Sequence, residues 1–183
     1  VACGDGIEGL RNRVILLLGF CGAFRRSELV GLDVGDLDFR LEGLVVRVRK
    51  SKTDQHGQGE NVAIRAHPYP ELCVVVALKK YLDVADIQKG PILLSITRKG
   101  RLTDRRICPQ AIWRVVRASA DACALPKRLG AHSMRAGFVT EAAKARKPLH
   151  AIMKKTRHKK VDTIMKYVRS VEALDDDAAE GLL

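Results

Sequence analysis

The sequence predicts a mainly helical domain of the α+β class with a small antiparallel β-sheet. Apolar residues recur at helical spacing over most of the chain, which indicates amphipathic helices. Two short alternating stretches flank a loop that contains glycine, which is the pattern of a β-hairpin. The 183 residues, 46% of them apolar, are enough for one domain with its own core.

Two helices are expected in the first third of the chain. Apolar residues dominate residues 9–24 after Arg11 and Arg13 near the start, which predicts a largely buried helix that ends at Gly22. Ser27 is a typical N-cap residue and predicts a second, short helix that extends to Leu32. Residues 33–42 are polar and are predicted to form turns.

The hairpin follows. Residues 44–49 alternate well enough for a strand, with Val46 and Val48 on one face and Arg47 and Arg49 on the other. Residues 61–64 are the expected antiparallel partner. Residues 50–59 form the loop between the two strands, and Lys52 lies within it.

Three more segments precede the C-terminal region. They are helices at residues 71–83 and 110–123 and a loop at residues 97–106. The first helix has an apolar face, expected in the core, of Leu72, Val75, Leu78 and Leu82. The loop holds five basic residues and one acid, which suits contacts with nucleic-acid phosphates. Trp113, in the second helix, is expected to pack against the protein rather than to stack on a base.

The C-terminal region is predicted to contain three helices. Ser133 is expected to cap the first, whose apolar side carries Val139. The second covers residues 149–157, and Asp162 starts a third with Ile164 on its apolar side.

The net charge of +12 is concentrated in residues 127–169. This segment holds thirteen Lys and Arg against two acids, Glu141 and Asp162, which is a net charge of +11. Such a basic region predicts a polyanionic partner, with double-stranded DNA ahead of a membrane surface. The longest apolar run is about ten residues, about half of what a membrane-spanning helix needs, so no membrane segment is expected.

Cysteines and histidines do not suggest a metal site. Five cysteines, an odd number without a CxxC pair, and five histidines show none of the spacings of zinc ligands. We therefore expect reduced thiols in a cytoplasmic protein, and no metal or other cofactor. The first residues lack a charged stretch and a cleavage site, so no signal peptide is expected.

The basic segment also carries residues suited to phosphate chemistry. His132 and Arg135 lie three apart and share one side of a first helical turn, where backbone N–H groups attract an anion. His158 and Tyr167 follow. A phenol has a pKa of about 10 in water, so a tyrosine that attacks at neutral pH needs nearby positive charge or a base. We interpret this segment as one that binds a phosphate and presents Tyr167 to it.

Two motifs nearer the N-terminus complete a pattern. Arg25 begins Arg-Arg-Ser-Glu-Leu, and Lys52 lies within Ser-Lys-Thr. In chain order, the full set is Arg25, Lys52, His132, Arg135, His158 and Tyr167. In order and spacing this set resembles the catalytic domain of the tyrosine recombinases, the phage-integrase family.

The resemblance implies the fold of that catalytic domain and a site-specific DNA recombinase, or integrase. Such an enzyme cleaves and rejoins DNA through a covalent 3′-phosphotyrosyl intermediate without metal or ATP. Tyr167 would be the nucleophile, and Arg25 and Arg135 would hold the non-bridging phosphate oxygens.

The remaining roles also come from the resemblance. Lys52 matches the general acid that protonates the departing 5′-oxygen, and His132 matches the position credited with proton transfer around the tyrosine. His158 matches a hydrogen-bond donor to the phosphate. Glu28 is either a structural residue that braces the phosphate pocket or a surface carboxylate. Where many family members have glycine before the second histidine, this chain has Arg157.

The same resemblance suggests how the chain is divided. Residues 1–169 would be the catalytic domain, and residues 170–183, with five acids and no base, a tail that packs as a helix on a neighbouring protomer. The family's N-terminal core-binding domain has no counterpart in the chain. In the full-length protein we expect a homo-oligomer, a tetramer on DNA.

Two other interpretations remain open. A type IB topoisomerase uses the same chemical groups to nick and reseal DNA without exchanging partners. A catalytically silent DNA-binding or regulatory module could retain the fold. The formation of a covalent protein–DNA adduct separates the silent module from the two enzymes.

Overall fold

The computed structural model describes residues 3–49, 59–125, 129–165 and 167–168. Its helices are α1 (Ile7–Cys21), α2 (Arg26–Gly31), α3 (Val74–Val84), α4 (Pro109–Ala122), α5 (Ala131–Lys144) and α6 (Leu149–Thr156). Its strands are β1 (Leu37–Arg40), β2 (Gly43–Val48), β3 (Glu60–Arg65), β4 (Leu94–Ile96) and β5 (Leu102–Arg106). Residues 161–165 are also helical. The predicted class, mainly helical with a small antiparallel sheet, is confirmed.

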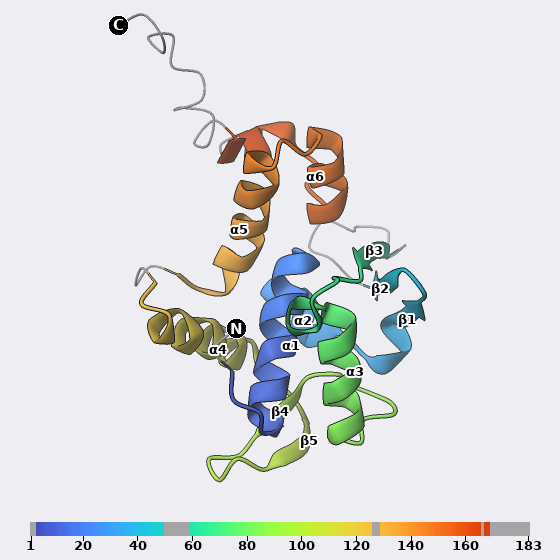
Figure 1. The fold of residues 1–183 in the computed structure, drawn as a ribbon, viewed down its shortest axis with the longest axis vertical. Coiled ribbons are helices and arrows are strands. Elements are labelled where there is room, and N and C mark those ends of the chain that lie inside the picture. The colour runs from blue at the N-terminus through green and yellow to red at the C-terminus, as the bar shows by residue number, and fades with distance from the viewer. Residues whose placement is uncertain (1–2, 50–58, 126–128, 166, 169–183) are drawn as a thin grey trace, which may run out of the picture.

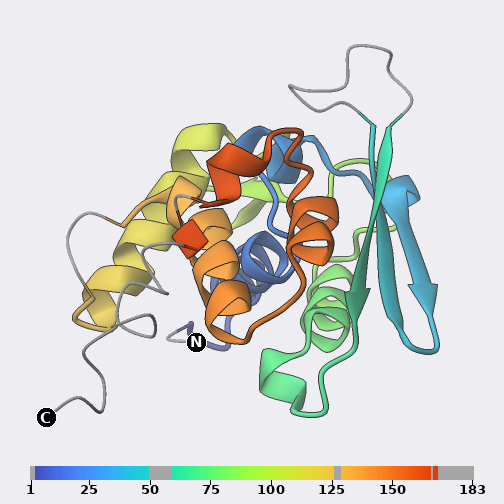
Figure 2. The ribbon, with the colours of Figure 1, turned by 90° about the horizontal axis from the view of Figure 1, so that it is seen from above.

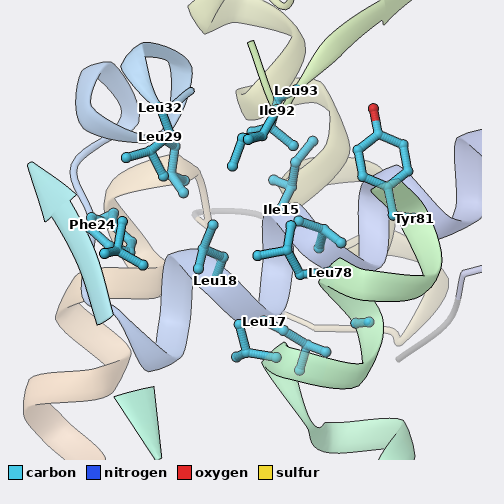
Figure 3. Packing of buried hydrophobic residues seen from close by; sticks show 14 of the residues in the cluster. Ile15, Leu17, Leu18, Phe24, Leu29, Leu32, Leu78, Tyr81, Ile92 and Leu93 are labelled. Carbon is cyan, nitrogen blue, oxygen red and sulfur yellow. The ribbon is translucent and has the colours of Figure 1, made fainter. Parts of the chain in front are cut away.

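Helix α1 is the centre of the fold, and it contacts α2, α3, α4 and α5 (Figure 1). Its sequence is apolar almost all round, which is typical of a buried helix. Ile15 and Leu18 are fully buried and pack with Leu78 of α3 in the main core (Figure 3). Gly22 is the C-cap, as predicted.

The predicted hairpin is confirmed. Strands β2 and β3 pair antiparallel, with Val46 opposite Val62, and the sheet lies at one side of the helices (Figure 2). The prediction of turns over residues 33–42 was partly wrong: Val34–Asp36 form a 3-10 turn and residues 41–42 a turn, but β1 adds a third strand beside β2. In β1, Leu37 and Phe39 are half-buried and alternate with exposed polar residues, so a four-residue strand covers the edge of the core.

The loop predicted over residues 97–106 is also partly wrong, since its second half is β5, which pairs with β4. Arg106 at the end of β5 is partly exposed, but its guanidinium is already paired within the protein. Its guanidinium donates to Asp33 at 2.5 Å and to the backbone carbonyls of Val30 and Leu32 at 2.7 and 3.1 Å. This basic side chain fastens β5 to the end of α2.

One core prediction fails in detail. Leu72 is 42% exposed, because Pro70 starts a separate 3-10 turn, Pro70–Leu72, and α3 begins only at Val74. Trp113 is 46% exposed, but one side of its ring lies against the protein. A Cβ atom on Gly130 would come within 3.2 Å of the Trp113 indole, so the ring lies beside the start of α5.

The C-terminal helices form a second, smaller core. Val139 of α5, Ile152 of α6 and Ile164 are buried together, and Phe138 and Tyr167 pack against them. Figure 1 shows α5 and α6 side by side beyond one end of α1. The three helices predicted in this region are confirmed. None of the described helices is both long and apolar enough to cross a membrane.

Candidate active site

A cluster of buried charged residues lies where the main core meets the C-terminal core. Glu28, Arg135 and Arg157 are 4%, 2% and 6% exposed. Buried charges are rare unless they are paired, because removing them from water is unfavourable. Their contacts hold the C-terminal helices to the turn between α1 and α2. Three candidate site residues, Arg25, Arg135 and His158, lie on these joined segments.

Arg25 and Glu28 are tied together at the start of α2. Arg25 is the N-cap of the helix, and the Glu28 carboxylate accepts hydrogen bonds from the Arg25 backbone N–H and from Nη1, both at 2.7 Å. The predicted cap, Ser27, is wrong: it lies inside the helix, and the Glu28 carboxylate takes the capping role. Glu28 is buried, so its interpretation as a surface carboxylate is wrong as well.

Arg135 lies in the second turn of α5 and points at the end of α1. Its Nη1 donates to the carbonyl of Ala23 at 2.8 Å, and Nη2 lies 3.4 Å from Nε2 of His158. Burial, and after it the charges of Arg25 and Arg157, lower the pKa of Arg135 to about 10; Glu28 and Tyr167 act in the opposite direction. The low pKa reflects burial first, and the positive charges of Arg25 and Arg157 that add to it would suit an anion.

Helix α5 begins about one turn earlier than predicted, because its N-cap is Gly130 rather than Ser133. Ser133, the predicted N-cap, lies three residues inside the helix, and its Oγ accepts the Gly130 N–H at 2.9 Å. His132 therefore lies in the first turn of α5, as predicted, although its side chain falls outside the part that the structure describes.

His158 follows α6 directly and is held by two side chains. Its Nδ1 lies 2.7 Å from Oγ1 of Thr156, and that hydroxyl lies 2.7 Å from the carbonyl of Ile152. Because the hydroxyl proton points to Ile152, its oxygen accepts from His158, and we assign the proton of the neutral ring to Nδ1. Nε2 then faces Arg135 as an acceptor.

Tyr167 is half-buried and packs against the C-terminal core. The Arg135 pKa responds to its charge, so Tyr167 and Arg135 are near enough to interact electrostatically. The structure thus brings Arg25, Arg135, His158 and Tyr167 to one region. Lys52 lies outside the described residues, although the strands on either side of its loop end at the paired residues Val48 and Glu60.

Arg157 was missed as a site residue by the sequence analysis. Its Nη2 donates to Oε2 of Glu28 at 2.6 Å, so the Glu28 carboxylate is shared between Arg157 and Arg25. Arg157 and Glu28 are 129 positions apart in the chain. The only signal in the sequence was that arginine replaces the glycine common in the family.

No group of three or more His, Cys, Asp or Glu side chains that could hold a metal ion occurs among the described residues. What the arrangement offers chemically is a set of guanidinium donors and an imidazole in the same region as a half-buried phenol. Guanidinium groups bind phosphate through two parallel, charge-assisted hydrogen bonds, so the site is suited to a phosphate ester.

Comparison with known proteins gives relatives that are longer than this chain. An integrase/recombinase XerD homolog from Selenomonas ruminantium is 39% identical over 175 residues, which are 95% of this chain and 51% of the relative. The tyrosine recombinase XerC of Myxococcus xanthus is 31% identical over 169 residues, 89% of this chain and 51% of the relative. The chain spans about half the length of these curated relatives.

Solved structures agree with the fold. The site-specific recombinase XerH, bound to a palindromic difH substrate in a post-cleavage complex, matches 98% of this chain and 48% of its own with a TM-score of 0.77 at 16% identity. The Tn1549 transposon integrase in complex with transposon right-end DNA matches 96% of this chain and 61% of its own, with a TM-score of 0.62 at 20% identity. The predicted integrase catalytic-domain fold is confirmed.

The family itself is shown by sequence. The model of the phage integrase family matches residues 2–173, nearly the whole chain. Together with a relative 39% identical across 95% of the chain, this match establishes that the protein belongs to the phage integrase family of tyrosine recombinases.

Proposed function

We propose that residues 1–169 are the catalytic domain of a site-specific recombinase that cleaves and rejoins double-stranded DNA. The observation that carries the proposal is the joining of Arg135 to His158, within electrostatic reach of Tyr167, in a chain of the phage integrase family. An anion that contacts these groups would meet donors from α5, from the end of α6 and from the N-terminus of α2.

The reaction begins with attack by the Tyr167 hydroxyl on the scissile phosphorus. The phenol loses its proton, a new bond forms from its oxygen to phosphorus, and the bond from phosphorus to the 5′-oxygen breaks. The products are a 3′-phosphotyrosine and a free 5′-hydroxyl. Arg25 and Arg135 hold the two non-bridging oxygens and offset the charge that develops on them, an effect worth about a hundred- to a thousandfold in rate for one donor.

Protons move through the remaining residues. Lys52 protonates the departing 5′-oxygen, and His132 takes the proton of Tyr167. Before DNA binds, Nε2 of His158 accepts a hydrogen bond from Arg135. When Nε2 carries a second proton, it can donate to the phosphate while Nδ1 keeps its hydrogen bond to Thr156. Rejoining runs the same steps in reverse with a 5′-hydroxyl from another strand.

The energy of the phosphodiester is retained in the phosphotyrosine, so exchange needs neither ATP nor a metal ion. DNA is the proposed partner because of the net charge of +12, most of it within residues 127–169, and the protein would act inside the cell. The relatives are named recombinases, which favours strand exchange over the relaxation carried out by a topoisomerase.

A homo-oligomer on DNA is the proposed state of the full-length protein, with the acidic tail, residues 170–183, bound to a neighbouring protomer. A groove of about 640 Å³ between α1, α3, α5 and α6 suits the apolar residues of such a tail. Phe20, Phe138 and Ile152 provide apolar walls, and Arg65 and Lys155 provide positive charge. Five acids and no base in the tail match that charge.

The test is formation of a covalent adduct. The intact protein that contains this chain is incubated with a nicked duplex carrying a sequence selected for binding to it, and the products are separated on a denaturing gel. We expect an adduct from the wild type and none from Tyr167→Phe. Absence of an adduct from wild-type protein bound to that DNA contradicts the proposal and favours a silent binding module.

A further inference from the structure

Arg157 adopts a backbone conformation that disfavours arginine. It ends α6 with φ 56° and ψ 41°, in the left-handed region that glycine enters without steric strain. A strained residue of this kind persists only where its surroundings hold it. Arg146, which follows the end of α5, provides a comparison: it has φ 51° but an exposed side chain.

The side chain of Arg157 is 2% exposed, and it enters the turn between α1 and α2. Nη2 donates to the Ala23 carbonyl at 3.1 Å and to Glu28, and Nη1 donates to the Gly22 carbonyl at 3.3 Å. The guanidinium carbon lies 5.1 Å from the centre of the Phe24 ring. Arg157 thereby binds the backbone of the residues that come just before Arg25.

Two of these partners are shared with the proposed phosphate-binding arginines. The Ala23 carbonyl also accepts from Arg135, and the Glu28 carboxylate also accepts from Arg25. A movement of the Arg157 guanidinium would therefore be passed to both arginines through groups that they hold in common. His158 is the next residue in the chain, so its backbone is fixed by the same anchor.

A further contact reaches the base of the Lys52 hairpin. Nε of Arg157 lies 3.8 Å from Oε2 of Glu60, the first residue of β3. Both atoms are buried, and neither has a hydrogen-bond partner among the residues that the structure describes. The separation is too long for a hydrogen bond, but the two opposite charges attract, and the 41% exposure of the Glu60 side chain lets water weaken that attraction. A small shift of β3 or of Arg157 would close the contact.

We propose that Arg157 is a positioning residue for DNA cleavage: it sets the phosphate-binding pair Arg25 and Arg135, His158 and the base of the Lys52 hairpin relative to one another. The inference rests on the proposed function. Residues that orient metal ligands typically contribute about ten- to a hundredfold to activity, and we expect an effect of that size when Arg157 is removed, with little change in how tightly the DNA is held.

The experiment uses the intact protein and measures three quantities: the rate of adduct formation at saturating protein, the DNA concentration for half-saturation, and Tm. The variants are Arg157→Gly, Arg157→Lys and Glu60→Gln. Asp86→Gly is the matched control, because Asp86 follows the end of α3, has φ 49° and an exposed side chain, and lies outside the basic segment of residues 127–169. Each is tested on two nicked duplexes, one natural and one with sulfur as the 5′-bridging atom. Sulfur departs without protonation, so a defect in the general acid does not slow it.

For Arg157→Gly we expect cleavage of the natural duplex to slow by about ten- to a hundredfold, with half-saturation changed by less than about threefold. Arg157→Lys keeps the positive charge but lacks the planar guanidinium with its several N–H donors, so it should retain part of the rate that Arg157→Gly loses. Glu60→Gln should be slower on the natural duplex and equal to wild type with sulfur. Asp86→Gly should match wild type on both.

The outcomes separate the two proposals. If the wild type forms an adduct and Arg157→Gly cleaves as fast as wild type, Arg157 has no positioning role, whatever its effect on Tm. A lower Tm in both Arg157 variants with unchanged rates contradicts the inference in the same way. If the wild type forms no adduct that depends on Tyr167, the proposed function fails and this inference fails with it.

Discussion

The buried carboxylate of Glu28 gives the largest stability effect that we expect from a single substitution. Its side chain is 1% exposed and accepts from Arg157 at 2.6 Å and from Arg25 at 2.7 Å. Glu28→Gln keeps the shape but removes the charge, and its amide N–H₂ group faces an arginine donor. Breaking a buried ion pair from one side costs about 3–5 kcal/mol, and we expect the lower end because one acceptor oxygen remains.

A loss of about 3 kcal/mol is a large share of the 5–15 kcal/mol that typically stabilises a domain. For a chain of this size it lowers Tm by roughly 6–12 °C. The measurement is urea unfolding followed by circular dichroism, with the m-value used to confirm that the same surface is exposed. Glu8→Gln is the control, because Glu8 pairs with Arg11 at 3.7 Å but is 59% exposed, and an exposed pair contributes about 1 kcal/mol or less.

The pH dependence provides an internal check. Burial alone would raise the pKa of Glu28, but the charge of Arg157 and the hydrogen bonds from Arg25 outweigh it and lower the pKa below its usual 4.5. A carboxylate with a lowered pKa in the folded state stabilises the protein above the unfolded value and loses that effect as the pH falls through the folded value. The difference in free energy of unfolding between the wild type and Glu28→Gln should therefore become smaller below about pH 4.5.

Two results would refute this reasoning. A loss below about 1 kcal/mol at pH 7 would mean that the Glu28 pairs contribute no more than surface ion pairs. A gap that stays constant from pH 7 into the acid range would mean that the charge of Glu28 is not what stabilises the fold.

Two further predictions concern the C-terminal region. Burial, and after it the charge of Arg157, lowers the pKa of Lys155 to about 8. Between about pH 8 and 10.5 the unfolded chain therefore binds more protons than the folded chain. The free energy of unfolding of the wild type minus that of Lys155→Met should rise with pH over that window, and a flat difference would contradict this prediction. Removal of residues 170–183 should abolish DNA-dependent oligomers in light scattering or crosslinking while single-site binding persists; oligomers of unchanged size would exclude the tail as the contact.

Much of the fold could be predicted because it depends on local patterns. The buried helix over residues 9–24, the hairpin around residues 50–59 and the three C-terminal helices follow from periodicity and turn residues. The errors occur where neighbours in space override local preference. Ser27 is a good N-cap by type, but Glu28 competes for that role because its carboxylate is already held by two arginines.

The candidate residues could be selected from spacing, but the network behind them could not. Arg157 contacts residues about 130 positions away, and no local pattern indicates that a basic residue after a helix will be buried. Its left-handed backbone is equally invisible in sequence, because that conformation usually belongs to glycine. Strand β1 was missed for a related reason: four residues with one half-buried face become a strand only beside β2.

The central claim is that Tyr167 forms a covalent bond to DNA. The most direct measurement is mass spectrometry of the adduct after digestion with nuclease and protease, which identifies the modified residue and the end of DNA attached to it. We predict a nucleotide joined through its 3′-phosphate to the peptide that contains Tyr167. A modification on any other residue, or a linkage through a 5′-phosphate, would contradict the account.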